Sequence, residues 1–156
     1  MAAAGLAALA RGEQSPVDAH VAACIDAWRR PRARIADGLA MAPLASAAID
    51  LSDGLAGDAR HLAEASGARL VLEEAALRMR TAGALDAVAT LLGRDALDLV
   101  LLGGEDYALL VASPSAIAGF ERVGRVESGA AEVVLEMLDG SRSVVAQRGF
   151  DHFAAE

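Results

Sequence analysis

Apolar residues recur along the chain with two different spacings, and the spacing separates predicted helices from predicted strands. In some stretches they return every three or four residues, which is typical of a helix with one buried face. Other stretches are short apolar runs bounded by turn-forming residues, which is typical of strands. The first pattern predicts helices over residues 2–11, 16–28, 35–41, 54–65, 82–93 and 95–101. The second predicts strands over residues 47–49, 69–73, 107–112, 120–126, 133–138 and 143–146.

Residues that favour helix ends and tight turns fix several of these boundaries. Ser15, followed by a proline, is expected to be the N-cap of the second helix. Thr81 is expected to cap the helix that runs to Gly93, and Gly67 to end the helix before it. The Asp139-Gly140 pair lies between two apolar runs and predicts a β-hairpin.

The order of these elements indicates the fold class. A chain of 156 residues fits one compact domain, residues 1–156, large enough to bury its own core. Helices and strands mix without the strict alternation of a doubly wound sheet. We therefore expect a layered α+β domain.

Composition and charge narrow the function classes. All 14 basic residues are arginines, so a phosphate-binding P-loop lysine and a Schiff-base lysine are excluded. The one cysteine, Cys24, excludes an intrachain disulfide and a multi-cysteine zinc site. A net charge of −8 and an aromatic share of 3% argue against nucleic acid as a partner. No apolar run is long enough for a membrane span, and a cytoplasmic protein without membrane association is expected.

The first candidate site is the segment that joins the strand at 47–49 to the following helix. Asp50, Ser52 and Asp53 lie there, and Asp58 follows one helical turn later. Carboxylates and a hydroxyl suit Mg²⁺, and a helix N-terminus suits a phosphate. On spacing alone, Ser52 or Asp53 serving only as the helix cap is the simpler interpretation.

Two further segments carry candidate chemistry. Gly103-Gly104-Glu105-Asp106-Tyr107 is either a backbone approach to a ligand or an ordinary turn with solvated acids. Phe150, in the C-terminal segment 148–153, either stacks on a ring or packs back on the sheet. The arginines of residues 29–34 form either a solvated loop or a phosphate clamp.

These segments occur in an order that resembles thiamine-monophosphate kinases, and specifically their C-terminal half. The resemblance rests on residues 30–34, 48–62, 103–107 and 149–153, and it covers about residues 4–153. It implies the fold of the aminoimidazole ribonucleotide synthetase superfamily, whose C-terminal domain is a layered α/β/α structure with a mixed sheet flanked by helices.

The resemblance also implies an activity, the ATP-dependent phosphorylation of thiamine monophosphate to thiamine diphosphate with Mg²⁺. By similarity, Asp50 and Asp53 bind Mg²⁺, and Ser52 contacts ATP. Glu105 and Phe150 contact the thiamine moiety. The family transfers the phosphoryl group directly, so no catalytic nucleophile is expected.

The chain also departs from the family. Leu102, Ala108 and the short segment 112–120 differ from the usual pattern. The family's N-terminal ATP-binding domain has no counterpart in these residues. We therefore expect the chain alone to be inactive and to need an N-terminal kinase domain as its partner. An exposed apolar patch near residues 50–55 is expected, with a possible homodimer formed through it. The alternative is a non-catalytic module of the same fold that binds a ligand or a partner.

Overall fold

The computed structural model describes residues 1–12 and 18–145. The helices are α1 (Ala2–Ala10), α2 (Ala19–Arg29), α3 (Ile35–Met41), α4 (Leu55–Ser66), α5 (Glu74–Thr81), α6 (Ala84–Leu92) and α7 (Ala96–Leu102). The strands are β1 (Ala47–Asp50), β2 (Arg69–Glu73), β3 (Leu109–Ala112), β4 (Gly124–Glu127), β5 (Val133–Glu136) and β6 (Arg142–Val144). No helix of these residues is long and apolar enough to cross a membrane.

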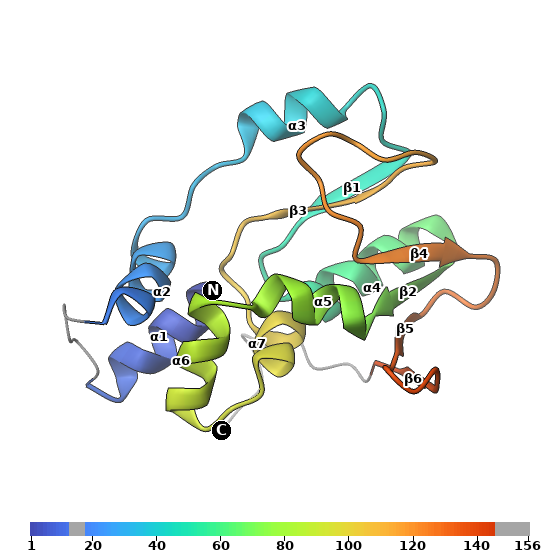
Figure 1. Cartoon of the computed structure of the whole chain (residues 1–156). Helices are drawn as coiled ribbons and strands as arrows, with labels where there is room; N and C mark the ends of the chain where they lie inside the picture. Colours follow the sequence, from blue (N-terminus) through green and yellow to red (C-terminus); the bar gives the residue numbers. More distant parts are fainter. Residues whose placement is uncertain (13–17, 146–156) are drawn as a thin grey trace, which may run out of the picture.

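The strands form two sheets. A four-stranded sheet has the order β4-β2-β5-β6, in which β2 and β5 are parallel and the other neighbours are antiparallel. The strands β1 and β3 pair antiparallel in a separate ribbon, from Ala47 opposite Ala112 to Asp50 opposite Leu109. Figure 1 shows α1, α2 and α6 grouped together, away from the four-stranded sheet. The α+β class with a mixed sheet, predicted from the sequence, is confirmed.

The core has two parts, both built mainly from leucine, valine and alanine. One part joins α4 and α7 to strands β2 and β5 through residues such as Leu62, Leu72 and Leu97. The other joins α1, α2 and α6. Helices α1 and α2 pack so closely that a Cβ atom on Gly5 would overlap the carbonyl group of Cys24. The small residues of α1 therefore set the distance between these two helices.

Two predicted helix starts were wrong. Helix α2 begins at Ala19, and its N-cap is Asp18, whose side chain accepts from the backbone N–H groups of His20 and Val21. Ser15, the predicted cap, lies outside the described residues. Thr81 caps no helix: it ends α5, and its hydroxyl donates to the carbonyl oxygen of Arg78.

Helix α5, for which the sequence analysis predicted no element, is held by one local and one distant contact of Glu74. The buried carboxylate of Glu74 accepts from Arg78 Nε at 2.7 Å and from the backbone N–H of Leu138 at 3.0 Å. The other turn predictions are confirmed. Gly67 and Gly93 end α4 and α6 in the left-handed conformation. The pair Asp139-Gly140 lies in the hairpin between β5 and β6.

The exposed apolar patch predicted near residues 50–55 does not include Leu55. Leu55 is only 6% exposed and belongs to the core. Exposed large apolar side chains occur in several places, among them α3 and the residues after it, where Ile35 is 70%, Leu39 73% and Leu44 48% exposed. Helix α3 buries none of its residues.

A network of ion pairs covers one part of the four-stranded sheet. Arg125 of β4 donates to Glu73, Glu127 and Glu136 at 2.7–2.9 Å. Arg142 of β6 donates to the same oxygen of Glu136 at 2.8 Å. The hydrogen bonds from Arg125, and then those from Arg142, lower the pKa of Glu136 from its ordinary value of 4.5 to about 2. The network ties strands β2, β4, β5 and β6 together.

We predict that Glu136→Gln makes the protein less sensitive to acid. A lowered pKa in the folded state contributes stability above pH 4.5, and this contribution is lost as the pH falls toward about 2. The melting temperature of the wild type should therefore fall more steeply than that of the variant over this range. Glu64→Gln, which removes an exposed carboxylate paired with Arg60, is the control and should follow the wild type. Parallel curves for wild type and Glu136→Gln would contradict the role of this network.

Candidate functional site

The first part of the candidate site is the turn between β1 and α4. Asp50 is the last residue of β1 and is exposed, whereas Ser52 and Asp53 are half-buried. Gly54 has a φ of 104°, and a Cβ atom there would lie 3.0–3.1 Å from the backbone of residues 101–103. This position therefore requires glycine, both for its conformation and for its close approach to the end of α7.

Neither Ser52 nor Asp53 caps α4, so the simpler interpretation of these residues is wrong. The N-cap residue of α4 is Gly54, and no side chain makes the cap hydrogen bond. The hydroxyl of Ser52 donates to Asp53 Oδ1 at 3.2 Å instead. The polar side chains of this turn are therefore available to a ligand.

Asp58 holds the turn in place. Its side chain is 3% exposed, and Oδ2 accepts from the backbone N–H of Asp53 at 3.0 Å. Burial raises the pKa of Asp58, and the hydrogen bond from the Asp53 N–H opposes that change. Asp58 is thus a buried support for the turn.

The second part of the site is the segment 103–107, which lies against the first. The backbone N–H of Glu105 donates to the Ser52 carbonyl at 2.8 Å, and that of Tyr107 donates to the Leu51 carbonyl at 2.9 Å. A Cβ atom on Gly104 would overlap the carbonyl oxygen of Ser52. Glycine at this position therefore lets two segments about fifty residues apart in the sequence come into backbone contact.

The contact gathers acidic side chains in one region. The hydroxyl of Tyr107 donates to Glu105 Oε2 at 3.1 Å. The hydrogen bond and charge of Glu105, and more weakly the charges of Asp50 and Asp53, raise the pKa of Tyr107. Asp50, Asp53 and Glu105 were predicted as site residues from separate motifs. All three contribute to raising the pKa of the same residue, Tyr107. Such a region attracts cations and cationic ligands.

The donor set fits a metal ion only in part. Among residues 1–12 and 18–145, no group of three or more histidine, cysteine or acidic side chains is arranged to hold a metal ion. Asp50 and Asp53 provide two carboxylates at the end of β1, and Mg²⁺ commonly takes one or two carboxylates together with phosphate oxygens. The residues present therefore suit a Mg²⁺ ion that is shared with a phosphate group.

Asp106 has a structural role that the sequence did not reveal. Its carboxylate accepts from the backbone N–H of Ala2 at 2.8 Å and pairs with the amino group of Met1 at 2.8 Å. It therefore caps the start of α1 from a segment 104 residues away. Local sequence carries no signal of this contact. Phe150, the remaining predicted site residue, lies outside the described residues.

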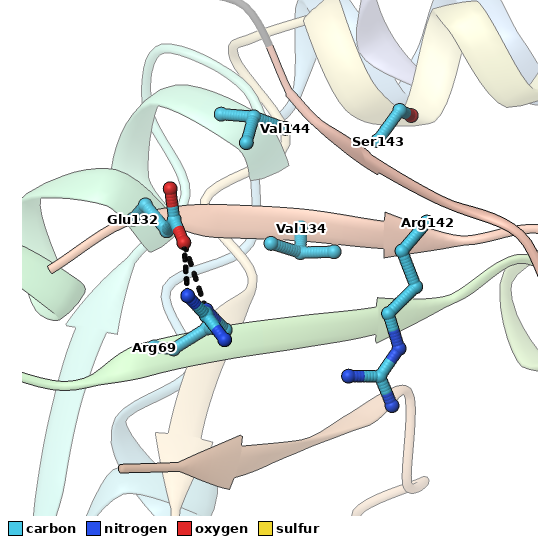
Figure 2. A pocket seen from close by; sticks show the side chains of 6 residues that line it. All are labelled: Arg69, Glu132, Val134, Arg142, Ser143 and Val144. Carbon is cyan, nitrogen blue, oxygen red and sulfur yellow. Dashed lines mark hydrogen bonds and ion pairs between the residues drawn. The ribbon is translucent and has the colours of Figure 1, made fainter. Parts of the chain in front are cut away.

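A surface pocket lies elsewhere, on the four-stranded sheet (Figure 2). It is lined by Arg69, Glu132, Val134, Arg142, Ser143 and Val144. Arg69 Nε donates to Glu132 Oε1 at 2.8 Å, and Arg142 belongs to the ion-pair network. Its arginines are thus already bound to carboxylates. None of the predicted site residues lines this pocket.

We predict that Asp58→Ala destabilises the protein and that Asp58→Asn does so less. Alanine leaves the N–H of Asp53 without its acceptor, which typically costs about 1–3 kcal/mol in the free energy of unfolding. Asparagine keeps an acceptor oxygen and removes a buried charge. Urea denaturation at neutral pH measures both effects. If both variants unfold at the wild-type urea concentration, Asp58 does not support the turn.

Comparison with curated proteins shows similarity to one group of enzymes. The chain is 48% identical over 93 residues to a thiamine-monophosphate kinase of Mycobacterium tuberculosis, covering 59% of this chain and 28% of that protein. It is 35% identical over 166 residues to a thiamine-monophosphate kinase of Salmonella typhimurium, covering 97% of this chain and 49% of that protein. The chain thus spans less than half the length of these curated relatives. No family model matches it.

Solved structures give the same result for the fold. The structure of AaThiL complexed with AMPPCP and TMP aligns with a TM-score of 0.83 and 31% sequence identity. The alignment covers 97% of this chain and 48% of that chain. The similarity therefore includes almost all of the elements in Figure 1.

Proposed function

The chain is a homologue of the C-terminal domain of thiamine-monophosphate kinases, and we propose that it provides part of the active site of such a kinase. The proposed reaction is the ATP- and Mg²⁺-dependent conversion of thiamine monophosphate to thiamine diphosphate. The observation that carries the proposal is the backbone contact between residues 51–52 and 105–107, which brings the metal-type and the substrate-type residues together. The solved relative complexed with AMPPCP and TMP supports it.

In this proposal the turn after β1 binds the nucleotide and its metal ion. Asp50 and Asp53 hold Mg²⁺ together with phosphate oxygens, and Ser52 contacts ATP. Bound Mg²⁺ neutralises the charge of the phosphoryl group that is transferred. The residues fit this role because neither aspartate is paired with an arginine among the described residues. Asp58 keeps the turn in place by accepting a hydrogen bond from the backbone N–H of Asp53.

Glu105 and Phe150 then bind the thiamine moiety. Thiamine carries a positive charge and an amino group, and an exposed carboxylate in an acidic region is suited to both. Phe150 is proposed to stack on a ring of the substrate. No covalent intermediate on the protein is needed, because the phosphoryl group passes directly between the two bound molecules.

The rest of the active site is proposed to lie outside these 156 residues. The solved relative extends to about twice the aligned length. An N-terminal kinase domain is proposed to supply the remaining metal and ATP ligands, so the chain alone is expected to bind ligands without catalysing transfer. Phosphoryl transfer requires all of these groups to be positioned to about half an ångström. Action in the cytoplasm is part of the same proposal.

We predict that calorimetric titration detects binding of Mg·ATP and that the carboxylates after β1 are responsible. The double variant Asp50→Asn/Asp53→Asn should weaken the affinity for Mg·ATP at least about tenfold, because it removes both carboxylates that hold the metal. Asp86→Asn, which makes the same chemical change at an exposed position on α6, should leave it unchanged. Equal affinities for the wild type and the double variant would contradict the assignment.

We predict that Glu105 contributes to binding of thiamine monophosphate and not to binding of Mg·ATP. Glu105→Gln should weaken thiamine monophosphate binding about tenfold, because it removes a charge opposite a cation, and should leave Mg·ATP binding unchanged. Glu121→Gln, at another exposed carboxylate, is the matched control. A folded wild-type chain that binds neither ligand would contradict a preformed half-site and favour a module that binds another partner.

A further inference from the structure

Tyr107 is the only tyrosine of the chain, and its backbone conformation is unusual. Its φ is 47°, and the φ of Glu105 is 68°; they are the two non-glycine residues with positive φ among those described. Side chains disfavour this conformation, most of all bulky ones, and it persists only where the surroundings impose it. Such residues are concentrated at ligand-binding and catalytic sites.

The surroundings here are the turn after β1. The N–H groups of Glu105 and Tyr107 both donate to carbonyls of that turn, those of Ser52 and Leu51. In addition, Ala108 accepts from the Leu51 N–H at 2.8 Å. These three hydrogen bonds fix the backbone on both sides of Glu105 and Tyr107. The strained conformation is therefore a product of the contact between the two segments.

The side chains of Glu105 and Tyr107 are hydrogen-bonded to each other in this conformation. The hydroxyl of Tyr107 donates to Glu105 Oε2 at 3.1 Å, although both side chains are exposed and the phenol is free to turn toward water. An exposed glutamate ordinarily samples several rotamers, and ordering it on ligand binding opposes affinity. A hydrogen bond formed before the ligand arrives reduces that loss.

We propose that Tyr107 is a positioning residue that holds the carboxylate of Glu105 in the orientation that binds the cationic, amine-bearing part of the substrate. The proposal rests on the proposed function for the role of Glu105. Tyr107 donates to Oε2, so that Oε1 is the oxygen that accepts from the substrate in this proposal. Tyr107 itself neither binds the metal nor transfers the phosphoryl group.

The first test is a spectrophotometric titration of the tyrosine. Tyr107 is the only tyrosine of the chain, so the near-ultraviolet tyrosinate absorbance between pH about 8 and about 12 reports Tyr107 alone. The wild type should titrate above the ordinary value for tyrosine, because ionisation breaks the bond to a carboxylate. Glu105→Gln should move the midpoint back toward that value, and Glu121→Gln should not. Identical midpoints for the wild type and Glu105→Gln would overturn the proposal.

The second test separates positioning from a merely structural role. Tyr107→Phe keeps the ring and removes the hydroxyl, and should weaken thiamine monophosphate binding about threefold to tenfold. In a Glu105→Gln background the same change should have no further effect, and the melting temperature should not change. A Tyr107→Phe variant that binds as tightly as the wild type would overturn the proposal. A wild type that binds no thiamine monophosphate would count against the proposed function, whereas the titration still decides whether Tyr107 holds Glu105.

Discussion

Three backbone hydrogen bonds between residues 51–52 and 105–108 hold the candidate site together. They continue the antiparallel pairing of β1 with β3 beyond the ends of both strands, where the chain carries its acidic side chains. Backbone bonds of this kind do not depend on the identity of the side chains, so the side chains remain available for binding. The acidic residues are thereby placed near one another on rigid supports and not on freely moving loops.

Neighbouring residues stabilise the contact between residues 51–52 and 105–108. Gly54 and Gly104 permit the close approach, and Asp58 satisfies the N–H of Asp53 from the buried face of α4. On the other side, Asp106 caps α1 and connects the site to the helical part of the core. The two acids of segment 103–107 are held by different contacts. Asp106 is committed to α1, and Glu105 points outward with Tyr107.

Sequence patterns correctly predicted the elements that depend on residue spacing and on turn-forming residues. Helix α3, strand β2 and the left-handed glycines that end α4 and α6 follow from spacing and from turn-forming residues, and the structure has them. Helix α5 was missed because Glu74 is satisfied by the N–H of Leu138, far along the chain. The sequence pattern predicts Tyr107 as the first residue of a strand, whereas β3 begins at Leu109, because the pairing with Leu51 imposes a positive φ on Tyr107. Leu55, expected in an exposed apolar patch, is buried in the core, and exposed apolar side chains occur on α3 and elsewhere. The metal and substrate roles of these residues follow from the resemblance to a known family, whereas the contact that unites them is tertiary.

The most direct test of this account is an NMR titration of the ¹⁵N-labelled chain with Mg·ATP and then with thiamine monophosphate. The account predicts that the amide signals of residues 51–54 and of residues 104–107 shift together with either ligand, because backbone hydrogen bonds couple the two segments. Shifts confined to one segment would contradict the claim that the two segments form a single site. Shifts centred on the pocket between Arg69 and Arg142 would place ligand binding elsewhere on the molecule.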